Sequence, residues 1–154
     1  MRIAAPALAA FAVALLASSP VFAAPTVDDV AGTWQTIDDE TKKPKSHVEI
    51  SISGGKATGK ILELINPSSP NPKCTECDGA KKDKPIVGLE IMWDLKPKKG
   101  EDQPTWEDGK IMDPKNGKTY DCKIWLKDMN TLIVRGSWLM FGREQTWHRL
   151  EPKA

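Results

Sequence analysis

Short segments that alternate apolar and polar residues, separated by tight-turn signals, recur along most of this chain. Val48, Ile50 and Ile52 alternate with polar residues, which places one face of a strand inside and the other in water. Gly54-Gly55 and Asn116-Gly117 favour the positive φ angles of hairpin turns. The same pattern predicts strands at 33–37, 48–52, 58–65, 87–95, 106–112, 118–127, 131–138 and 144–150.

Helices are expected to contribute little. Thr26, followed three residues later by Asp29, predicts one short helical turn before the first strand. No segment longer than two turns carries an apolar stripe of helical period. About eight short strands joined mostly by short turns predict an all-β fold, a single antiparallel up-and-down β-barrel, because closure leaves no exposed edge strand.

The two ends of this strand series carry matching motifs. Gly32-Thr33-Trp34 opens the first strand, and Thr146-Trp147-His148-Arg149 lies on the last. A Gly-x-Trp on an early strand with an Arg on the last strand resembles the small calycin barrels, such as lipocalins. The resemblance implies that these strands pair and that Arg149 lies over Trp34. We call Trp34, Trp147 and Arg149 the floor clasp, a structural feature rather than a binding site.

The first residues have the composition of a secretory signal peptide. Met1-Arg2 supplies a positive charge, residues 3–16 are apolar, and Val21-Phe22-Ala23 offers a cleavage site. The apolar run is shorter than the roughly 20 residues that a membrane-spanning helix needs, and nothing later resembles a second span. We expect cleavage after Ala23, one β-barrel domain at 24–154, no remaining transmembrane segment, and a periplasmic or secreted location.

Charge is balanced in the expected mature chain. The sequence has 22 Lys and Arg against 21 Asp and Glu, and Arg2 leaves with the signal peptide. Nucleic-acid binding requires a basic surface that neutralises phosphates, so no nucleic-acid partner is expected. We find no Gly-rich phosphate loop and no signature of a catalytic set, and we expect neither an enzyme nor a cofactor.

Three cysteines, Cys74, Cys77 and Cys122, are expected in the mature protein. The Cys-x-x-Cys motif lies in a long Pro-rich loop, residues 66–85, and fits a local disulfide, part of a metal site or a redox pair. An oxidising compartment and the absence of further paired ligands favour a structural disulfide between Cys74 and Cys77, and no metal. Cys122 is expected to be a buried thiol, its alternative being a bridge to one of the other two.

Tryptophan is unusually common, with six Trp against one Tyr and three Phe. Trp side chains line apolar pockets, but more often they pack in a core. The pattern leaves the roles of four of them open, with Trp125 out of phase with the buried face of its strand. With the arginines on the closing strands, the candidate ligand-binding residues are Trp93, Trp106, Tyr120, Arg135 and Arg143.

Several motifs follow one another in a characteristic order. They include Cys74-x-x-Cys77, Asp113-Pro114-x-Asn116-Gly117-Lys118-x-Tyr120 and Phe141-Gly142-Arg143-x-Gln145-Thr146-Trp147-x-Arg149. This order is similar to an uncharacterised family of exported bacterial proteins, catalogued as domain of unknown function 2147. The resemblance implies a lipocalin-like β-barrel in the periplasm and no assigned activity. Asp108-Gly109 stands where the family usually has Gly-Gly.

Two structural expectations follow from these motifs. Asp113 should hydrogen-bond the backbone of the Asn116-Gly117 turn, as Asx residues do. A buried arginine needs a partner, so one of Arg135, Arg143 and Arg149 should pair with Asp113 or lie on an indole face. Such a network fits either a ligand site or a structural latch.

These features favour a non-enzymatic periplasmic binding protein that holds a small or partly apolar ligand at the open end of the barrel. Two alternatives stay open. The chain could be an envelope protein-interaction or structural factor that uses the 66–85 loop, or the Cys-x-x-Cys motif could have a thiol redox role. Fold analogy is the main support for the first hypothesis.

Overall fold

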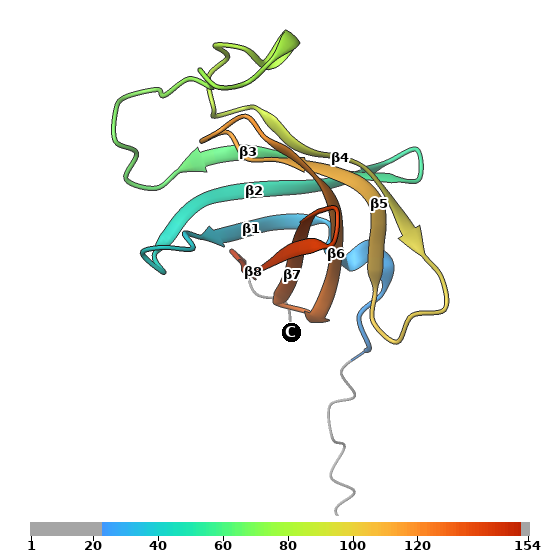
Figure 1. The fold of residues 1–154 in the computed structure, drawn as a ribbon. Coiled ribbons are helices and arrows are strands. Elements are labelled where there is room, and N and C mark those ends of the chain that lie inside the picture. Colours follow the sequence, from blue (N-terminus) through green and yellow to red (C-terminus); the bar gives the residue numbers. More distant parts are fainter. Residues whose placement is uncertain (1–22, 152–154) are drawn as a thin grey trace, which may run out of the picture.

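A computed structural model describes residues 23–151, and in it eight antiparallel strands close into one barrel (Figure 1). Each strand pairs with its sequence neighbours, and the last pairs with the first, so the expected up-and-down β-barrel is confirmed. Most of the predicted signal peptide lies outside the described residues. The strands are β1 (Gly32–Ile37), β2 (Pro44–Ser53), β3 (Lys56–Leu64), β4 (Glu90–Lys98), β5 (Thr105–Met112), β6 (Thr119–Asp128), β7 (Thr131–Trp138) and β8 (Phe141–Arg149).

Two single 3-10 turns accompany the strands, η1 (Val27–Val30) and η2 (Gly79–Lys81). The η1 turn begins after Thr26, whose backbone N–H and hydroxyl donate to the Asp29 carboxylate at 2.9 and 2.8 Å. This is the expected short turn before the first strand, stabilised at its N-terminus by a nearby carboxylate.

Strand β4 is shifted from its predicted position, and β2 and β8 begin earlier than predicted, at Pro44 and Phe141. Residues 87–89, expected in the strand, form a turn in which the Leu89 N–H donates to the Ile86 carbonyl at 3.1 Å, with Gly88 at φ +89°. Residues 96–98, expected in a polar loop, extend the strand and pair with β5. Alternation in the sequence could not reveal this, because the neighbouring strand decides how far the ladder runs.

The strands alternate in direction, so their connections fall at two ends of the barrel. We call the end that carries η1 the floor and the other end the mouth. The floor holds η1 and the connections 54–55, 99–104 and 129–130. The mouth holds the connections 38–43, 65–89, 113–118 and 139–140.

Arg149 closes the floor. Its guanidinium lies 4.2 Å from the centroid of the Trp34 ring and donates to three backbone carbonyls, those of Asp29 (2.5 Å), Ala31 (3.0 Å) and Met129 (2.7 Å). The residue is 6% exposed, and burial lowers the pKa of its guanidinium from the ordinary value. Because carbonyls and an indole face surround the cation, its partners here are structural.

Glycine at position 32 is required by this arrangement. Its φ of +136° is one that side-chain-bearing residues rarely adopt, and an added Cβ would lie 2.5 Å from a guanidinium nitrogen of Arg149. The Gly-x-Trp motif therefore makes room for the arginine as well as supplying the ring beneath it.

Large buried side chains fill the half of the barrel nearest the floor. The Trp34 indole donates to the Val30 carbonyl at 2.9 Å, and the Trp106 indole donates to the Val27 carbonyl at 2.8 Å, so both rings are tied to η1. Buried indoles need such a partner for their N–H. Their fully buried neighbours in the core include Ile50, Leu95, Ile124, Leu126 and Leu132.

The seam that closes the barrel is short. Strands β1 and β8 pair only through Trp34 with Arg149 and Gln35 with His148, both near the floor. One further backbone bond, from the Leu150 N–H to the Thr33 carbonyl, extends the contact at the floor side. Towards the mouth, β1 and β8 are no longer paired through their backbones. Contacts between side chains join the two sides of the seam there.

Candidate ligand-binding site at the mouth of the barrel

The half of the barrel nearest the mouth holds a cavity of about 290 Å³. This is close to the lower limit of the roughly 300–1,000 Å³ of sites for small molecules, so a ligand enclosed here would be small. On β8 the lining residue nearest the floor is Trp147, which is 2% exposed. The aliphatic and thioether side chains of the lining are those of Ile37, Ile61, Leu64, Ile91, Ile111, Met112 and Val134.

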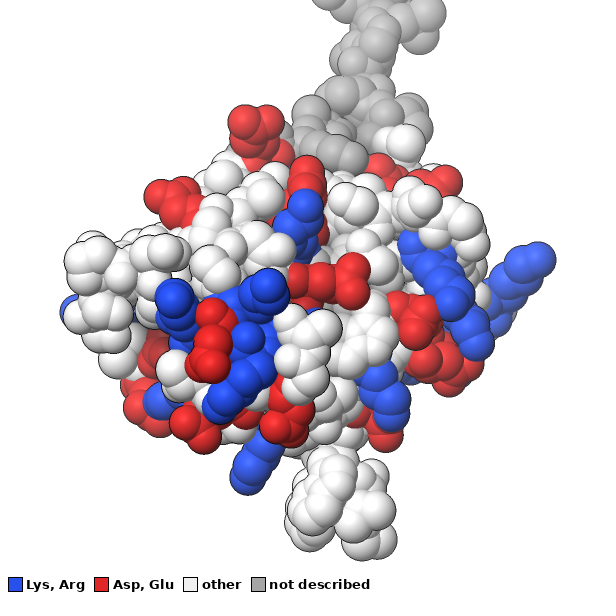
Figure 2. All heavy atoms as spheres, turned by 90° about the horizontal axis from the view of Figure 1, so that it is seen from above, with Lys and Arg blue, Asp and Glu red and all other residues white. Residues whose placement is uncertain are grey.

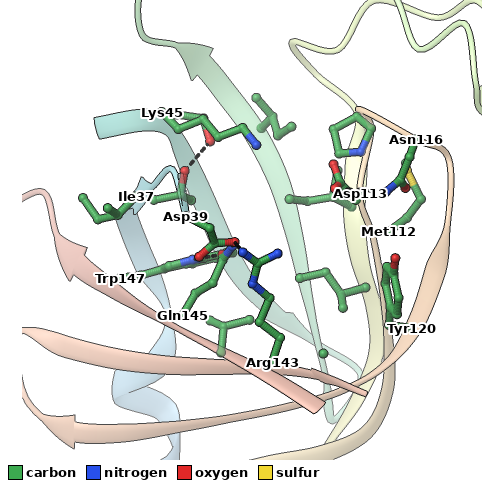
Figure 3. A pocket seen from close by; sticks show the side chains of 18 of the residues that line it. Ile37, Asp39, Lys45, Met112, Asp113, Asn116, Tyr120, Arg143, Gln145 and Trp147 are labelled. Atoms are coloured by element: carbon green, nitrogen blue, oxygen red, sulfur yellow. Dashed lines mark hydrogen bonds and ion pairs between the residues drawn. The ribbon is translucent and has the colours of Figure 1, made fainter. Parts of the chain in front are cut away.

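A chain of polar contacts runs from this inner end to the rim (Figure 3). The Trp147 indole donates to Gln145 Oε1 at 3.1 Å, and Gln145 Nε2 donates to Asp39 Oδ2 at 2.6 Å. The same carboxylate oxygen lies 3.2 Å from a guanidinium nitrogen of Arg143. Asp39 belongs to the β1–β2 connection, so these contacts join β8 to the β1 side where the backbone ladder has ended.

Strand alternation explains why β8 supplies these groups. Residues two apart on a strand point to the same face, and Arg149 and Trp147 are buried inside the barrel. Gln145 and Arg143 continue that series towards the mouth and line the cavity. The exposed fraction of the side chain is 69% for Arg143 against 22% for Asp39, so the arginine is the more accessible partner.

The opposite wall is the β5–β6 turn, residues 113–118. Asp113 Oδ1 accepts a hydrogen bond from the Lys115 N–H at 2.9 Å, and Asn116 Oδ1 accepts one from the Lys118 N–H at 2.9 Å. These are the local contacts expected of Asx residues in a turn. Tyr120 follows on β6 and lines the cavity beside this turn (Figure 3).

Each of the three arginines has a different partner, and none of these contacts involves Asp113. Arg149 lies on the Trp34 indole, Arg143 pairs with Asp39, and Arg135 pairs with Glu144 at 3.0 Å. The expectation of an indole face holds for Arg149. The expected pairing of an arginine with Asp113 does not occur. The Asp113 carboxylate instead accepts a hydrogen bond from the Lys115 N–H within its own turn.

The long loop, residues 66–85, packs against the outside of this wall. Cys74 and Cys77 form a disulfide, and both are buried. The Cys74 sulfur lies 3.4 Å from the Pro114 carbonyl oxygen, and the Cys77 sulfur lies 3.6 Å from the Met112 sulfur. A Cβ at Gly117 would overlap with the backbone of Glu76, so only glycine allows this approach.

Of the five candidate ligand-binding residues, the structure brings Tyr120 and Arg143 to the cavity and places the other three elsewhere. Trp106 is 1% exposed and packs at the floor against η1. Arg135 pairs with Glu144 on the outer face of β7, because the inward positions of that strand are Leu132 and Val134. Trp93 is half-buried, with the Lys81 ammonium 3.6 Å from its ring centroid.

Irregular strands explain why Trp106 and Trp93 do not line the cavity. A register shift separates Trp106 from Gly109 on β5, and Asp108 within it has φ +61°. Another shift interrupts the pairing of β3 with β4, where Asp94 has φ +60°. Simple alternation fails across such bulges, so the sequence could not decide which tryptophans face inward.

Two polar residues on the β8 side of the cavity, Gln145 and Asp39, are not among the ligand-binding candidates predicted from the sequence. Alternation along the last strand could have identified Gln145, because it lies in phase with Trp147 and Arg149. Asp39 carries no comparable signal, because no periodic pattern marks a turn residue that folds over the end of a strand. Its place at the cavity depends on how the β1–β2 connection crosses the seam.

Cys122 is a free, buried thiol and forms no bridge to Cys74 or Cys77. Burial raises the pKa of this thiol from 9.0 to about 12. In the part of the chain from 23 to 151, no group of three or more His, Cys, Asp or Glu is arranged to hold a metal ion. Within those same residues, no helix has the length and apolar character needed to cross a membrane.

Comparison with known proteins agrees with this architecture. A solved structure of protein HP1028 from Helicobacter pylori, described as belonging to the lipocalin family, superposes with a TM-score of 0.66. The sequence identity is 24%, over 79% of this chain and 82% of that one, so the likeness concerns the fold. Among curated proteins, none matches the chain. Residues 32–149 match the family described as uncharacterised protein conserved in bacteria, DUF2147, and the chain belongs to that family.

Proposed function

We propose that this protein binds a small, partly apolar ligand in the cavity at its mouth and acts as a carrier or sensor rather than as an enzyme. The observation that carries the proposal is an open cavity of about 290 Å³ in a barrel whose other half is filled by large side chains. Apolar cavities with a few convergent polar groups are the usual form of small-molecule sites.

The lining suggests how a ligand would be oriented. Aliphatic side chains surround the inner part, whereas Asp39, Gln145 and Arg143 lie together at the rim on one side. Tyr120 and Asn116 lie on the opposite side (Figure 3). A ligand with an apolar body and one polar end would bury the body against the aliphatic wall and exchange hydrogen bonds at the rim.

Asp39 is the residue that governs access in this proposal. It bridges β8 to the β1–β2 connection through Gln145 and Arg143, at the part of the seam that lacks a backbone ladder. Side-chain contacts at a partly exposed site exchange more readily than a ladder of backbone bonds. A polar ligand end that competes for Arg143 would loosen this bridge on entry.

We place this binding in the periplasm or outside the cell, on the strength of the signal-peptide composition of residues 1–23. The burial of both sulfurs of the Cys74–Cys77 disulfide supports a bracing role rather than thiol exchange, which requires an accessible sulfur. The loop that carries them contacts the wall of the cavity, so it serves the same site.

Native mass spectrometry of protein purified from its own host tests the proposal. We expect a bound small molecule on the natural protein and its loss from Val134→Phe, because a larger side chain at this lining position fills the cavity. Ile133→Phe is the matched control, since the adjacent residue on β7 points to the other face of the strand. The control should retain the ligand.

A second cavity variant, Ile61→Phe on β3, covers the case in which Val134→Phe alone disturbs folding. Thermal unfolding of all variants separates misfolding from a blocked site. Retention of the ligand by both folded cavity variants would contradict the proposed site. A natural protein that never carries a small molecule, or that binds none from a lipophilic library, would contradict the function.

A further inference from the structure

The turn between β7 and β8 presents four consecutive apolar side chains to solvent. The exposed fractions are 65% for Trp138, 79% for Leu139, 89% for Met140 and 73% for Phe141. The other exposed large apolar side chains among residues 23–151 are each 42% exposed and stand singly along the chain. We call residues 138–141 the apolar tip. Contiguous exposure of this kind marks an interaction site rather than ordinary surface.

The backbone of the tip reinforces this conclusion. Trp138 and Phe141 pair in register, so Leu139 and Met140 form a two-residue turn, in which Leu139 has φ +53°. A positive φ at the first position of such a turn favours Gly or Asn, and in the two-residue turn between β2 and β3 this position is Gly54, with φ +57°. Keeping large apolar residues where the backbone disfavours them points to a function for the side chains.

The shape of the tip favours a lipid bilayer over a protein partner. A stable protein interface usually needs about 20–30 residues on each side, whereas the tip offers four side chains on a convex turn. Insertion into the boundary between headgroups and acyl chains requires no complementary surface. Trp with Phe and Leu is also the composition of segments that bind there.

Two arginines stand directly behind the tip. Arg143 lies two residues after Phe141, and the guanidinium of Arg135 lies so close to Gly142 that a Cβ there would come within 2.6 Å of it. Inserted to the depth of the turn, both guanidinium groups would reach headgroup phosphates, which they bind in a bidentate manner. Each also has a carboxylate partner, Asp39 or Glu144, so their net charge is compensated.

We propose that the apolar tip inserts into the interface of a lipid bilayer and thereby holds the mouth of the barrel against the membrane surface. Gly136 and Arg143, which pair in register two residues behind the apolar tip, both line the cavity. The membrane contact and the cavity opening therefore share one hairpin. This inference goes beyond ligand binding and does not depend on it.

Apolar insertion rather than charge should provide most of the attraction. The two arginines behind the tip are each paired with a carboxylate, and acidic and basic side chains are interspersed over the face of the molecule shown in Figure 2. Binding should therefore persist when salt screens surface charges. It should also change little between vesicles of phosphatidylcholine and vesicles that contain phosphatidylglycerol.

Flotation with such vesicles tests the proposal on the full mature chain. We expect the natural protein to float with the vesicles and the variant L139N/M140G to lose at least tenfold in partitioning. Asn tolerates the positive φ of position 139 better than Leu does, and Gly at position 140 accepts any backbone angle, so the variant should fold about as well as the natural protein. Leu62→Asn, which removes an exposed apolar side chain from β3, is the matched control and should float normally.

Two further readouts separate the possible causes. Val134→Phe should still bind vesicles, so a failed ligand experiment and a failed membrane experiment remain distinguishable. Normal flotation of L139N/M140G, absence of natural-protein binding to both vesicle types, or release at moderate salt would each overturn the proposal. It would also be overturned if sedimentation showed that the tip instead joins two copies of the chain in the absence of lipid.

Discussion

The floor and the mouth of this barrel are built from the same eight strands, yet they use polar side chains in opposite ways. At the floor, Arg149 donates to three backbone carbonyls and lies on the Trp34 ring, and large side chains occupy the space around it. At the mouth, Arg143 is largely exposed, pairs with a side chain and borders a cavity. The two arginines lie six residues apart on β8, and both point inward.

This contrast separates stability from function within a single fold. A buried cation whose partners are backbone groups is costly to remove, because each acceptor would lose its hydrogen bond. An exposed ion pair contributes little to stability, so its residues are free to serve a ligand. The floor therefore holds the barrel closed, and the mouth supplies the candidate site.

The largest expected effect compares the two arginines directly. Arg149→Ala should lower the free energy of unfolding by about 3 kcal/mol or more, because three carbonyls and an indole face lose a buried charged partner. Arg143→Ala should lower it by less than about 1 kcal/mol. Urea unfolding of both variants measures the difference. Similar losses for the two substitutions would break the distinction between floor and mouth.

A second comparison uses two glycines with similar backbone angles. Gly117 at the mouth has φ +69° and Gly55 at the floor has φ +73°, so alanine should cost each position about 1 kcal/mol of conformational strain. At Gly55 an added Cβ meets nothing within 4 Å, whereas at Gly117 it overlaps with the Glu76 carbonyl of the disulfide loop. Gly117→Ala should therefore cost about 1–3 kcal/mol more than Gly55→Ala.

Thermal or urea unfolding provides the measurement for this pair, and the ligand assay provides a second one. Because the loop braces the wall of the cavity, Gly117→Ala should also weaken ligand retention, whereas Gly55→Ala should not. Equal stability of the two alanine variants would mean that the loop does not press on the turn as described.

The smallest expected effect concerns Cys122, which lies on β6 two residues further from the mouth than Tyr120. Its raised pKa, from 9.0 to about 12, is caused by burial, so the folded state retains a proton that the unfolded state releases between these values. Stability should therefore be unaffected below pH 9 and fall above it, by at most about 1.4 kcal/mol per pH unit.

Unfolding experiments from pH 8 to pH 10.5 detect this slope when the natural protein is compared with Cys122→Ala. Labelling by a thiol reagent at pH 8 should also be about a thousandfold slower than for a thiol of ordinary pKa. Fast labelling of the folded protein would contradict the burial of this thiol and its raised pKa.

Much of the floor could be predicted from the sequence. Trp34 and Arg149 belong to local motifs, and the end-to-end pairing of such motifs is a property of the family that they resemble. The mouth was predicted less completely. Tyr120 and Arg143 were predicted and line the cavity, whereas Trp93, Trp106 and Arg135 were predicted and lie elsewhere, and Asp39 and Gln145 were not predicted. Alternation alone would have excluded Arg135 and included Gln145, whereas bulges hid the orientation of Trp106.

By itself, the sequence determined the fold class, the position of most strands, the turns at Gly54-Gly55 and Asn116-Gly117, and the two motifs that meet at the seam. These features depend on residues close together in the chain, whose periodicity and turn preferences act locally. Tertiary structure decided how far the seam is closed, which tryptophans fill the barrel, and how Asp39 and the disulfide loop reach the cavity. Those outcomes depend on register and loop packing between distant segments, where no local rule applies.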